Sequence, residues 1–338
     1  MDDNAVKTLF LPFEQDAVPA PKAGEHWLFL NAEVPHGDNG DFQSFLTCVQ
    51  GFRPKFLDLH RGGYATLPEL DGSANFAGAL VLLGKHRNEN RRNIHLALER
   101  ALNGAPVLIA GARTSGIESM RKEMSKLLPI EASWSKHHAQ VFQLRRTVNW
   151  IAPAPQSAVR LESNGLSFKT ASGMFSHTTV DAGSALLAEY LGSLTGQCAD
   201  FGAGWGYLSC MAAIKSEGIE TLHLFEADYP SLRAAEANVT SLFRNRSASF
   251  NWTDLAQEPP KDKFDFIIMN PSFHIGRRAD AGIGKRMIEV ASASLRPGGQ
   301  LLLVANKQLA YEDTLQKSFR RFERIGEDRV YKVIRAVR

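Results

Sequence analysis

Short apolar runs alternate with amphipathic segments along the second half of the 338-residue sequence. Apolar runs of about four to eight residues between turns are typical of buried strands, whereas apolar residues at every third or fourth position are typical of helices. We therefore expect strands ending at 201 and 226 and spanning 264–269 and 300–305, helices at 207–216 and 231–242, and a closing hairpin of 322–325 and 330–337. This alternation predicts a doubly wound, mostly parallel sheet with its site beyond the carboxyl ends of the strands.

The first half repeats this order more faintly. We expect strands at 79–85, 106–111 and 141–144, with helices at 88–102 and 117–128 between them. We interpret the first half as a duplicated relative of the second, although two unrelated α/β domains could produce the same order. The first domain is expected to be degenerate, because Gly84-Lys85-His86-Arg87 stands where the second half has a tetrapeptide of chemical interest at 270–273.

The stretch 151–157 is rich in proline and small residues, which favours an extended connector. A chain of this length is also more often divided into two domains than folded as one. We therefore predict an α/β protein with two tandem Rossmann-like domains, a degenerate one at 1–150 and a second one at 151–338.

Composition narrows the class of protein. A hydrophobic content of 44% and a charged content of 22% are those of a globular domain, and a net charge of +3 neither requires nor opposes a nucleic-acid partner. Cys48, Cys198 and Cys210 are too few and too scattered for a disulfide framework or a zinc site. The chain begins without a basic signal-peptide start and has no apolar stretch of the roughly 18 residues that span a bilayer. We expect a cytoplasmic monomer without metal or membrane.

A glycine-rich segment follows the strand that ends at 201 and precedes a helix. Glycine lets the backbone turn tightly and approach a ligand, and a helix N-terminus offers free N–H groups. The segment could hold the pyrophosphate of a dinucleotide or the methionine carboxylate of S-adenosylmethionine (SAM), or it could be a plain strand–helix turn. The cofactor-binding candidates here are Asp200, Gly202, Gly204 and Gly206.

Two acidic residues follow the next strands. Glu226 ends a strand about twenty residues after the glycine segment, where a carboxylate can accept hydrogen bonds from ribose hydroxyls. Asp254 follows the third strand, where it could accept from the adenine amine. Glu226 could instead be a surface residue, since a second acidic residue, Asp228, lies close by in the sequence. Asp254 could instead cap its own loop.

The tetrapeptide Asn270-Pro271-Ser272-Phe273 follows the buried strand 264–269. An exocyclic amine on an aromatic base is a poor nucleophile, because its lone pair is delocalised into the ring. The Asn270 side-chain oxygen and the Pro271 carbonyl could accept the two amine hydrogens while Phe273 stacks on the base, so that catalysis is mainly orientation and electrostatic support. Together with the glycine segment, these residues predict a SAM-dependent N-methyltransferase, with Asn270 beside the cofactor as well as the substrate.

Basic residues surround this tetrapeptide and also occur in the first half. His274, Arg277 and Arg278 could contact the base or the phosphates of a flipped nucleotide, or they could be solvated surface groups. Between residues 85 and 126, nine Lys and Arg stand against four Glu. An RNA-facing surface containing Arg91, Arg92 and Lys122 is one interpretation, and solvated helix surfaces are the other.

The sequence resembles the guanine-N2 ribosomal RNA methyltransferases of the small-subunit RsmC type. That family carries Asn-Pro-Pro-Phe-His, which 270–274 matches except at Ser272. It also carries a Gly-Val-Phe-Ser segment leading to Asp-x-Gly-Ser; 173–176 matches the first except at Met174, and 181–184 matches the second. The segment 110–117 resembles one in the family's first domain. The resemblance implies two methyltransferase-like domains, of which the first binds RNA and stabilises the second. It also implies SAM as cofactor, S-adenosylhomocysteine as product, and ribosomal RNA or an assembling small subunit as partner.

Two departures leave alternatives open. Ser272 replaces the family's second proline, and Trp205 is unusual within the glycine segment, where it could pack beside the cofactor. Another N-methyltransferase is the nearest alternative, acting on large-subunit RNA, adenine N6 or a protein glutamine. A ribosome-assembly factor with a decayed site is an alternative of a different class.

Overall fold

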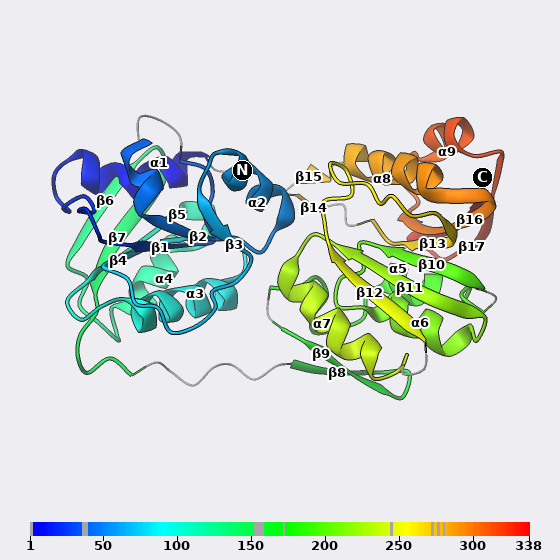
Figure 1. The fold of residues 1–338 in the computed structure, drawn as a ribbon, viewed down its shortest axis with the longest axis horizontal. Helices are drawn as coiled ribbons and strands as arrows, with labels where there is room; N and C mark the ends of the chain where they lie inside the picture. Colours follow the sequence, from blue (N-terminus) through cyan, green and yellow to red (C-terminus); the bar gives the residue numbers. More distant parts are fainter. Residues whose placement is uncertain are drawn as a thin grey trace. The chain divides into compact units, whose positions relative to one another are not determined.

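The computed structural model describes residues 3–35, 40–151, 159–171, 173–192, 194–243, 246–271, 274–275, 278–279 and 281–338 (Figure 1). The chain divides into two compact units, Met1–Ser157 and Ala158–Arg338. Each unit is built around its own seven-stranded sheet.

The first unit places its strands in the order β3-β2-β1-β4-β5-β7-β6. β1 to β5 run parallel, and β7 runs antiparallel to both β5 and β6. Its elements are α1 (Asp3–Glu14), β1 (Trp27–Leu30), η1 (Gly40–Phe45), β2 (Leu46–Val49), α2 (Arg53–Arg61), β3 (Ala65–Leu67), β4 (Gly78–Leu82), α3 (Arg87–Arg100), β5 (Pro106–Ala112), η2 (Arg113–Ser115), α4 (Ile117–Met124), β6 (Ala132–Lys136) and β7 (Ala139–Arg145).

The second unit opens with a separate hairpin, followed by a sheet in the order β12-β11-β10-β13-β16-β18-β17. Its first elements are β8 (Val159–Ser163), β9 (Leu166–Thr170), α5 (Ala182–Ala188), β10 (Gly196–Phe201), α6 (Tyr207–Lys215), β11 (Ile219–Glu226), α7 (Tyr229–Thr240) and β12 (Ser247–Trp252). The remaining ones are β13 (Phe264–Met269), β14 (His274–Ile275), β15 (Arg278–Ala279), α8 (Ala281–Ser294), β16 (Leu295–Asn306), α9 (Glu312–Ser318), β17 (Arg321–Glu327) and β18 (Tyr331–Val337).

The two sheets share one topology. When the strands of each sheet are numbered in chain order, both sheets read 3-2-1-4-5-7-6, and in both the last-but-one strand of this order is antiparallel to its neighbours. The predicted fold class, two mostly parallel α/β sheets in tandem, is confirmed. In the second sheet the chain starts at β10 and proceeds outward first to one side and then to the other, so the carboxyl ends of β10 and β13 border the switch point where such sheets bind ligands.

Helices cover both faces of the second sheet, with α6 and α7 on one face and α8 and α9 on the other (Figure 1). Alternate residues of its strands therefore enter different cores. Leu222 and Leu224 of β11 join one core, whereas Phe225 joins the other. Burial of each such side chain contributes about 1.5–3 kcal/mol, which holds the strand ends rigidly in place. All three cysteines are free and buried: Cys198 and Cys210 lie in the core that contains Leu222, and Cys48 lies in a core of the first unit.

Candidate active site at the ends of β10, β11 and β13

The glycine loop joins β10 to α6, and all three of its glycines have left-handed backbones. The φ angles are 78° at Gly202, 55° at Gly204 and 88° at Gly206. A Cβ on Gly206 would lie 3.1 Å from Ala235 on α7, so glycine is required there both by conformation and by packing. Beside Gly204 there is open space within 4 Å. The loop can therefore admit a ligand at Gly204, while Gly206 holds it against α7.

Two acidic side chains lie behind this loop. The fully buried Asp200 accepts a hydrogen bond from Ser209 Oγ at 2.6 Å through Oδ2, while its Oδ1 has no partner in the described part of the chain. Glu226 accepts from the backbone N–H of Gly204 at 2.7 Å and of Asp228 at 2.8 Å. Burial raises the pKa of Asp200 to about 7 and that of Glu226 to about 7. The carboxyl groups of Asp200 and Glu226 thus form a pair of hydrogen-bond acceptors that suits donors or a positively charged group of a ligand.

Asn270 follows β13 and is held from a distant part of the sequence. Its Nδ2 donates to Asp181 Oδ2 and to Ser184 Oγ, both at 2.8 Å. A carboxylate cannot donate, so the amide nitrogen must face Asp181, and Oδ1 faces the other way. Among the described residues no donor bonds to this oxygen. Asn270 therefore presents a free acceptor at the carboxyl end of β13.

The other predicted substrate residues continue from this point. Pro271 is buried directly after Asn270. His274 and Arg278 belong to the short antiparallel hairpin β14–β15, in which His274 pairs with Ala279 and Ile275 with Arg278. Their side chains, like Phe273 and Arg277 as a whole, lie outside the described residues.

Asp254 is engaged within its own loop. Its carboxylate accepts from the Ala256 N–H at 3.0 Å and from the Gln257 side chain at 2.7 Å. The structure thus places it as a loop cap and does not bring it into the group formed by Asp200, Glu226 and Asn270.

Trp205 is packed into the core of the second unit. It is 5% exposed, and its ring packs against Phe168 and Tyr207 with centroids 5.2 and 5.8 Å apart. Its Nε1 donates to the Phe175 carbonyl at 3.0 Å. Trp205 therefore ties the segment that leads to Asp181 onto the glycine loop.

Asp181 and Ser184, which both bond to Asn270, were not among the candidate site residues of the sequence analysis. Two local signals were present: an Asp three residues before a Ser at a helix start, which indicates an N-cap, and the match of 181–184 to the family's Asp-x-Gly-Ser segment, which by itself gave neither residue a role. Asp181 does cap α5, since its Oδ2 also accepts from the Ser184 N–H at 2.8 Å. The contact with Asn270, 89 residues away, appears only in the folded chain.

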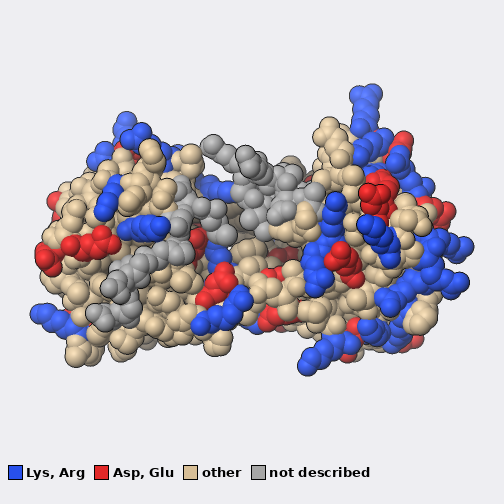
Figure 2. All heavy atoms as spheres, turned by 90° about the horizontal axis from the view of Figure 1, so that it is seen from above, with Lys and Arg blue, Asp and Glu red and all other residues tan. Residues whose placement is uncertain are grey.

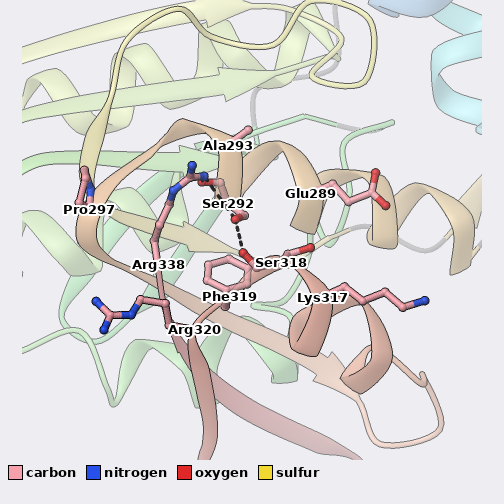
Figure 3. Close-up of a pocket in the computed structure, with 9 residues that line it drawn as sticks. All are labelled: Glu289, Ser292, Ala293, Pro297, Lys317, Ser318, Phe319, Arg320 and Arg338. Carbon is pink, nitrogen blue, oxygen red and sulfur yellow. Dashed lines mark hydrogen bonds between the residues drawn. The ribbon is translucent and has the colours of Figure 1, made fainter.

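A shallow groove of about 660 Å³ lies elsewhere on this unit, at the opposite edge of the sheet, between α8, α9 and the start of β16 (Figure 3). Here Arg338 donates to the Ser292 carbonyl, and Ser292 Oγ donates to the Ser318 carbonyl at 2.5 Å. Figure 2 shows Lys and Arg side chains gathered on this part of the second unit. The C-terminal ends of α8 and α9 direct backbone carbonyls into the groove. Positive side chains such as Arg338 are favourable beside such carbonyls, so a structural role accounts for the cations of the groove.

Within the described ranges, no three His, Cys, Asp or Glu side chains are grouped so that they could hold a metal ion. In the same ranges, no helix is both long enough and apolar enough to cross a membrane.

Comparison with known proteins gives concordant matches. The methyltransferase small domain family model matches residues 165–335. Ribosomal RNA small subunit methyltransferase C of Chromohalobacter salexigens is 30% identical over 72% of this chain and 73% of its own, and that of Aliivibrio fischeri is 26% identical over 79% of each. The structure of the T. thermophilus 16S rRNA N2 G1207 methyltransferase, solved with AdoMet and guanosine, is 22% identical and superposes with a TM-score of 0.81, covering 99% of this chain and 92% of that one.

Proposed function

The chain belongs to the methyltransferase small domain family and, within it, to the ribosomal RNA small subunit methyltransferase C proteins, and from this we propose that it transfers a methyl group from SAM to the exocyclic N2 of a guanine in small-subunit ribosomal RNA. The observation that carries the proposal is the free side-chain oxygen of Asn270 beside an open glycine loop. Ribosomal RNA is the partner, and the cytoplasm, where ribosomal subunits are found, is the proposed place of action.

The residues of the glycine loop and of the acidic pair fit SAM. The open space beside Gly204 can receive the methionine portion without a steric clash. Glu226 at the end of β11 can accept hydrogen bonds from the ribose hydroxyls, since each carboxylate oxygen has a second lone pair. The unpartnered buried oxygen of Asp200 costs about 1–3 kcal/mol in the free protein, and the ammonium group of the cofactor could relieve that cost. When bound, SAM supplies an electrophilic methyl group.

The acceptor end of the site fits an aromatic amine. Asn270 Oδ1 and the Pro271 carbonyl can accept the two N2 hydrogens, which orients the nitrogen lone pair towards the methyl group. As the bond between nitrogen and the methyl carbon forms, the bond from carbon to sulfur breaks, and both electrons of that bond stay on sulfur. The nitrogen gains positive charge that the two acceptors stabilise, and its proton then leaves to water. We propose Phe273 as the stacking residue and His274, Arg277 and Arg278 as contacts to the surrounding nucleotide.

The first unit shares the topology of the second, but the described residues that directly follow β1, 31–35, contain no glycine. At the corresponding strand ends, Asn31 donates to the Leu82 carbonyl at 2.9 Å, and Gln50 donates to the Ala32 carbonyl at 2.7 Å. Asn90 bonds both the N–H and the carbonyl of Gly84. Side-chain amides of the chain itself thus bond to the backbone at the carboxyl ends of these strands, and we propose that this unit binds RNA and stabilises the second unit.

The RNA-facing cations of the first unit differ in their availability. Arg91 and Arg87 are both paired with Glu123. Arg92 and Lys122 are exposed and form no ion pair within the described residues. We propose that Arg92 and Lys122 contact RNA phosphates, whereas Arg91 mainly joins α3 to α4.

Replacing Asn270 with Ala tests the proposed function. We expect methylation of small-subunit RNA to fall by about 10²–10³-fold, because an acceptor for the developing charge is lost, while SAM binding measured by calorimetry changes little. Asn306→Ala is a matched control, because Asn306 ends the neighbouring strand but caps only the Gln308 N–H. Mass spectrometry of RNA nucleosides identifies the product, and the proposal fails if the wild-type protein forms no N2-methylguanosine.

A further inference from the structure

The side chain of Asn270 is clamped by Asp181, the N-cap of α5, and by Ser184 within α5. Asp181 Oδ2 accepts one hydrogen bond from Asn270 Nδ2, and Ser184 Oγ accepts another, both at 2.8 Å. An asparagine side chain has two N–H donors and one acceptor oxygen. Both donors are therefore occupied, and the oxygen alone is available for the substrate.

The clamp also excludes the opposite amide orientation. A rotation of about 180° would place Asn270 Oδ1 against the Asp181 carboxylate, which has no hydrogen to share with it. The bond to an ionised acceptor is also stronger than one to a neutral group, by roughly a factor of two. The oxygen of Asn270 is thus oriented before any substrate binds.

The clamp is anchored on both sides. Upstream, the segment that leads to Asp181 is bonded to the body of the unit through Thr170 Oγ1 to the His177 carbonyl, at 2.7 Å, and through Trp205 in the glycine loop to the Phe175 carbonyl. On the other side, a Cβ on Gly183 would lie 3.1 Å from the Tyr331 ring on β18, so α5 starts in close contact with the sheet. Asp181 therefore links the position of the acceptor to that of the glycine loop.

We propose that Asp181, assisted by Ser184, is a positioning residue for methyl transfer: it acts through Asn270 by directing Oδ1 towards the amine of the base. This inference rests on the proposed function. It assigns Asp181 no proton and no contact with the cofactor, because its two mapped bonds are to the Ser184 N–H and to Asn270.

The test must separate positioning from helix capping. Serine is as good an N-cap as aspartate but is too short to reach Asn270, so Asp181→Ser removes the clamp and keeps the cap. Asparagine retains an oxygen at the position of Oδ2, so Asp181→Asn should rescue. We expect Asp181→Ser to lower kcat by about 10²-fold with unchanged SAM affinity and a small change in KM, and Asp181→Asn to remain within about tenfold of wild type.

A double-mutant cycle with Asn270→Ala makes the test decisive. If Asp181 acts through Asn270, Asp181→Ser costs nothing further in the Asn270→Ala background. The inference is overturned if Asp181→Ser keeps full kcat, if the two losses multiply, or if Asp181→Ser weakens SAM binding, which would make Asp181 a cofactor contact. A wild-type protein that forms no N2-methylguanosine would instead refute the proposed function, so the two failures are distinguishable.

Discussion

Gly206 and Gly204, six and four residues after the buried Asp200, should respond differently to substitution by alanine. At Gly206, alanine must adopt a φ of 88°, which costs about 1–2 kcal/mol. Its Cβ would also lie 3.1 Å from Ala235 and 3.3 Å from Val239, both fully buried on α7, and such overpacking costs about 1–3 kcal/mol. Gly206→Ala should therefore lower the free energy of unfolding by roughly 2–5 kcal/mol.

At Gly204 the φ of 55° lies where alanine is tolerated at a cost of about 1 kcal/mol, and there is open space within 4 Å of its Cβ. The open space is where we place the methionine portion of SAM. Gly204→Ala should therefore weaken SAM binding by about tenfold or more, the effect of a modest clash worth about 1.4 kcal/mol, with little loss of stability.

Urea unfolding followed by tryptophan fluorescence measures the first effect, and calorimetric titration with SAM measures the second. With a slope of about 2 kcal/mol per molar urea, Gly206→Ala should shift the unfolding midpoint of the second unit by about 1 M or more. Equal destabilisation by both substitutions, or tight SAM binding by Gly204→Ala, would refute the assignment of one glycine to packing and the other to the ligand.

Other predictions concern charge. The raised pKa values of Asp200 and Glu226, about 7 for each, mean that the folded protein without SAM binds more protons than the unfolded chain between about pH 4 and 7. Its free energy of unfolding should therefore fall as pH rises through this range, by about 3 kcal/mol for Glu226 alone, and Glu226→Gln should flatten the change in urea titrations at pH 5 and 8. SAM affinity should rise over the same range, since ionised Glu226 is the better acceptor, and a calorimetric pH series that stays flat would contradict its role. Arg92→Glu should weaken binding to small-subunit RNA. It should also reduce, by about one, the slope of the logarithm of the binding constant against the logarithm of the salt concentration, as measured by fluorescence anisotropy at several salt concentrations. Arg91→Ala should mainly destabilise the first unit, because Glu123, whose pKa the Arg91 guanidinium holds at about 2, then loses its closest partner.

The sequence predicted the second sheet better than the first. The strands around β10, β11, β13 and β16 are continuous apolar runs next to glycine turns, and the structure places them close to where they were expected. In the first unit, β4, β5 and β7 were expected, but β1, β2 and β3 were missed. These three strands have only three or four residues, and β3 is largely exposed, so neither length nor apolarity distinguishes them. Their pairing with longer neighbours makes them strands.

Some features of the candidate site were likewise expected from the sequence, and others were not. The family resemblance, drawn from the motifs at 173–176, 181–184 and 270–274, is confirmed, and the acidic residue at the end of β11 lies beside the glycine loop. The packing of Trp205 against Phe168 could not be predicted, because it depends on a neighbour distant in sequence. The contacts of Asp254 are those of a loop cap, which was one of the two interpretations of that residue.

By itself, the sequence determined the fold class, the family and the position of the acceptor tetrapeptide, because apolar periodicity, glycines at a strand–helix turn and the Asn270-Pro271 pair are local signals. Only the tertiary structure decided which way Asn270 faces. Asp181 lies 89 residues away, and an isolated amide has two nearly equivalent orientations. The orientation is selected when folding brings a carboxylate, which can accept but not donate, against one side of that amide, so that the side-chain oxygen faces the other way.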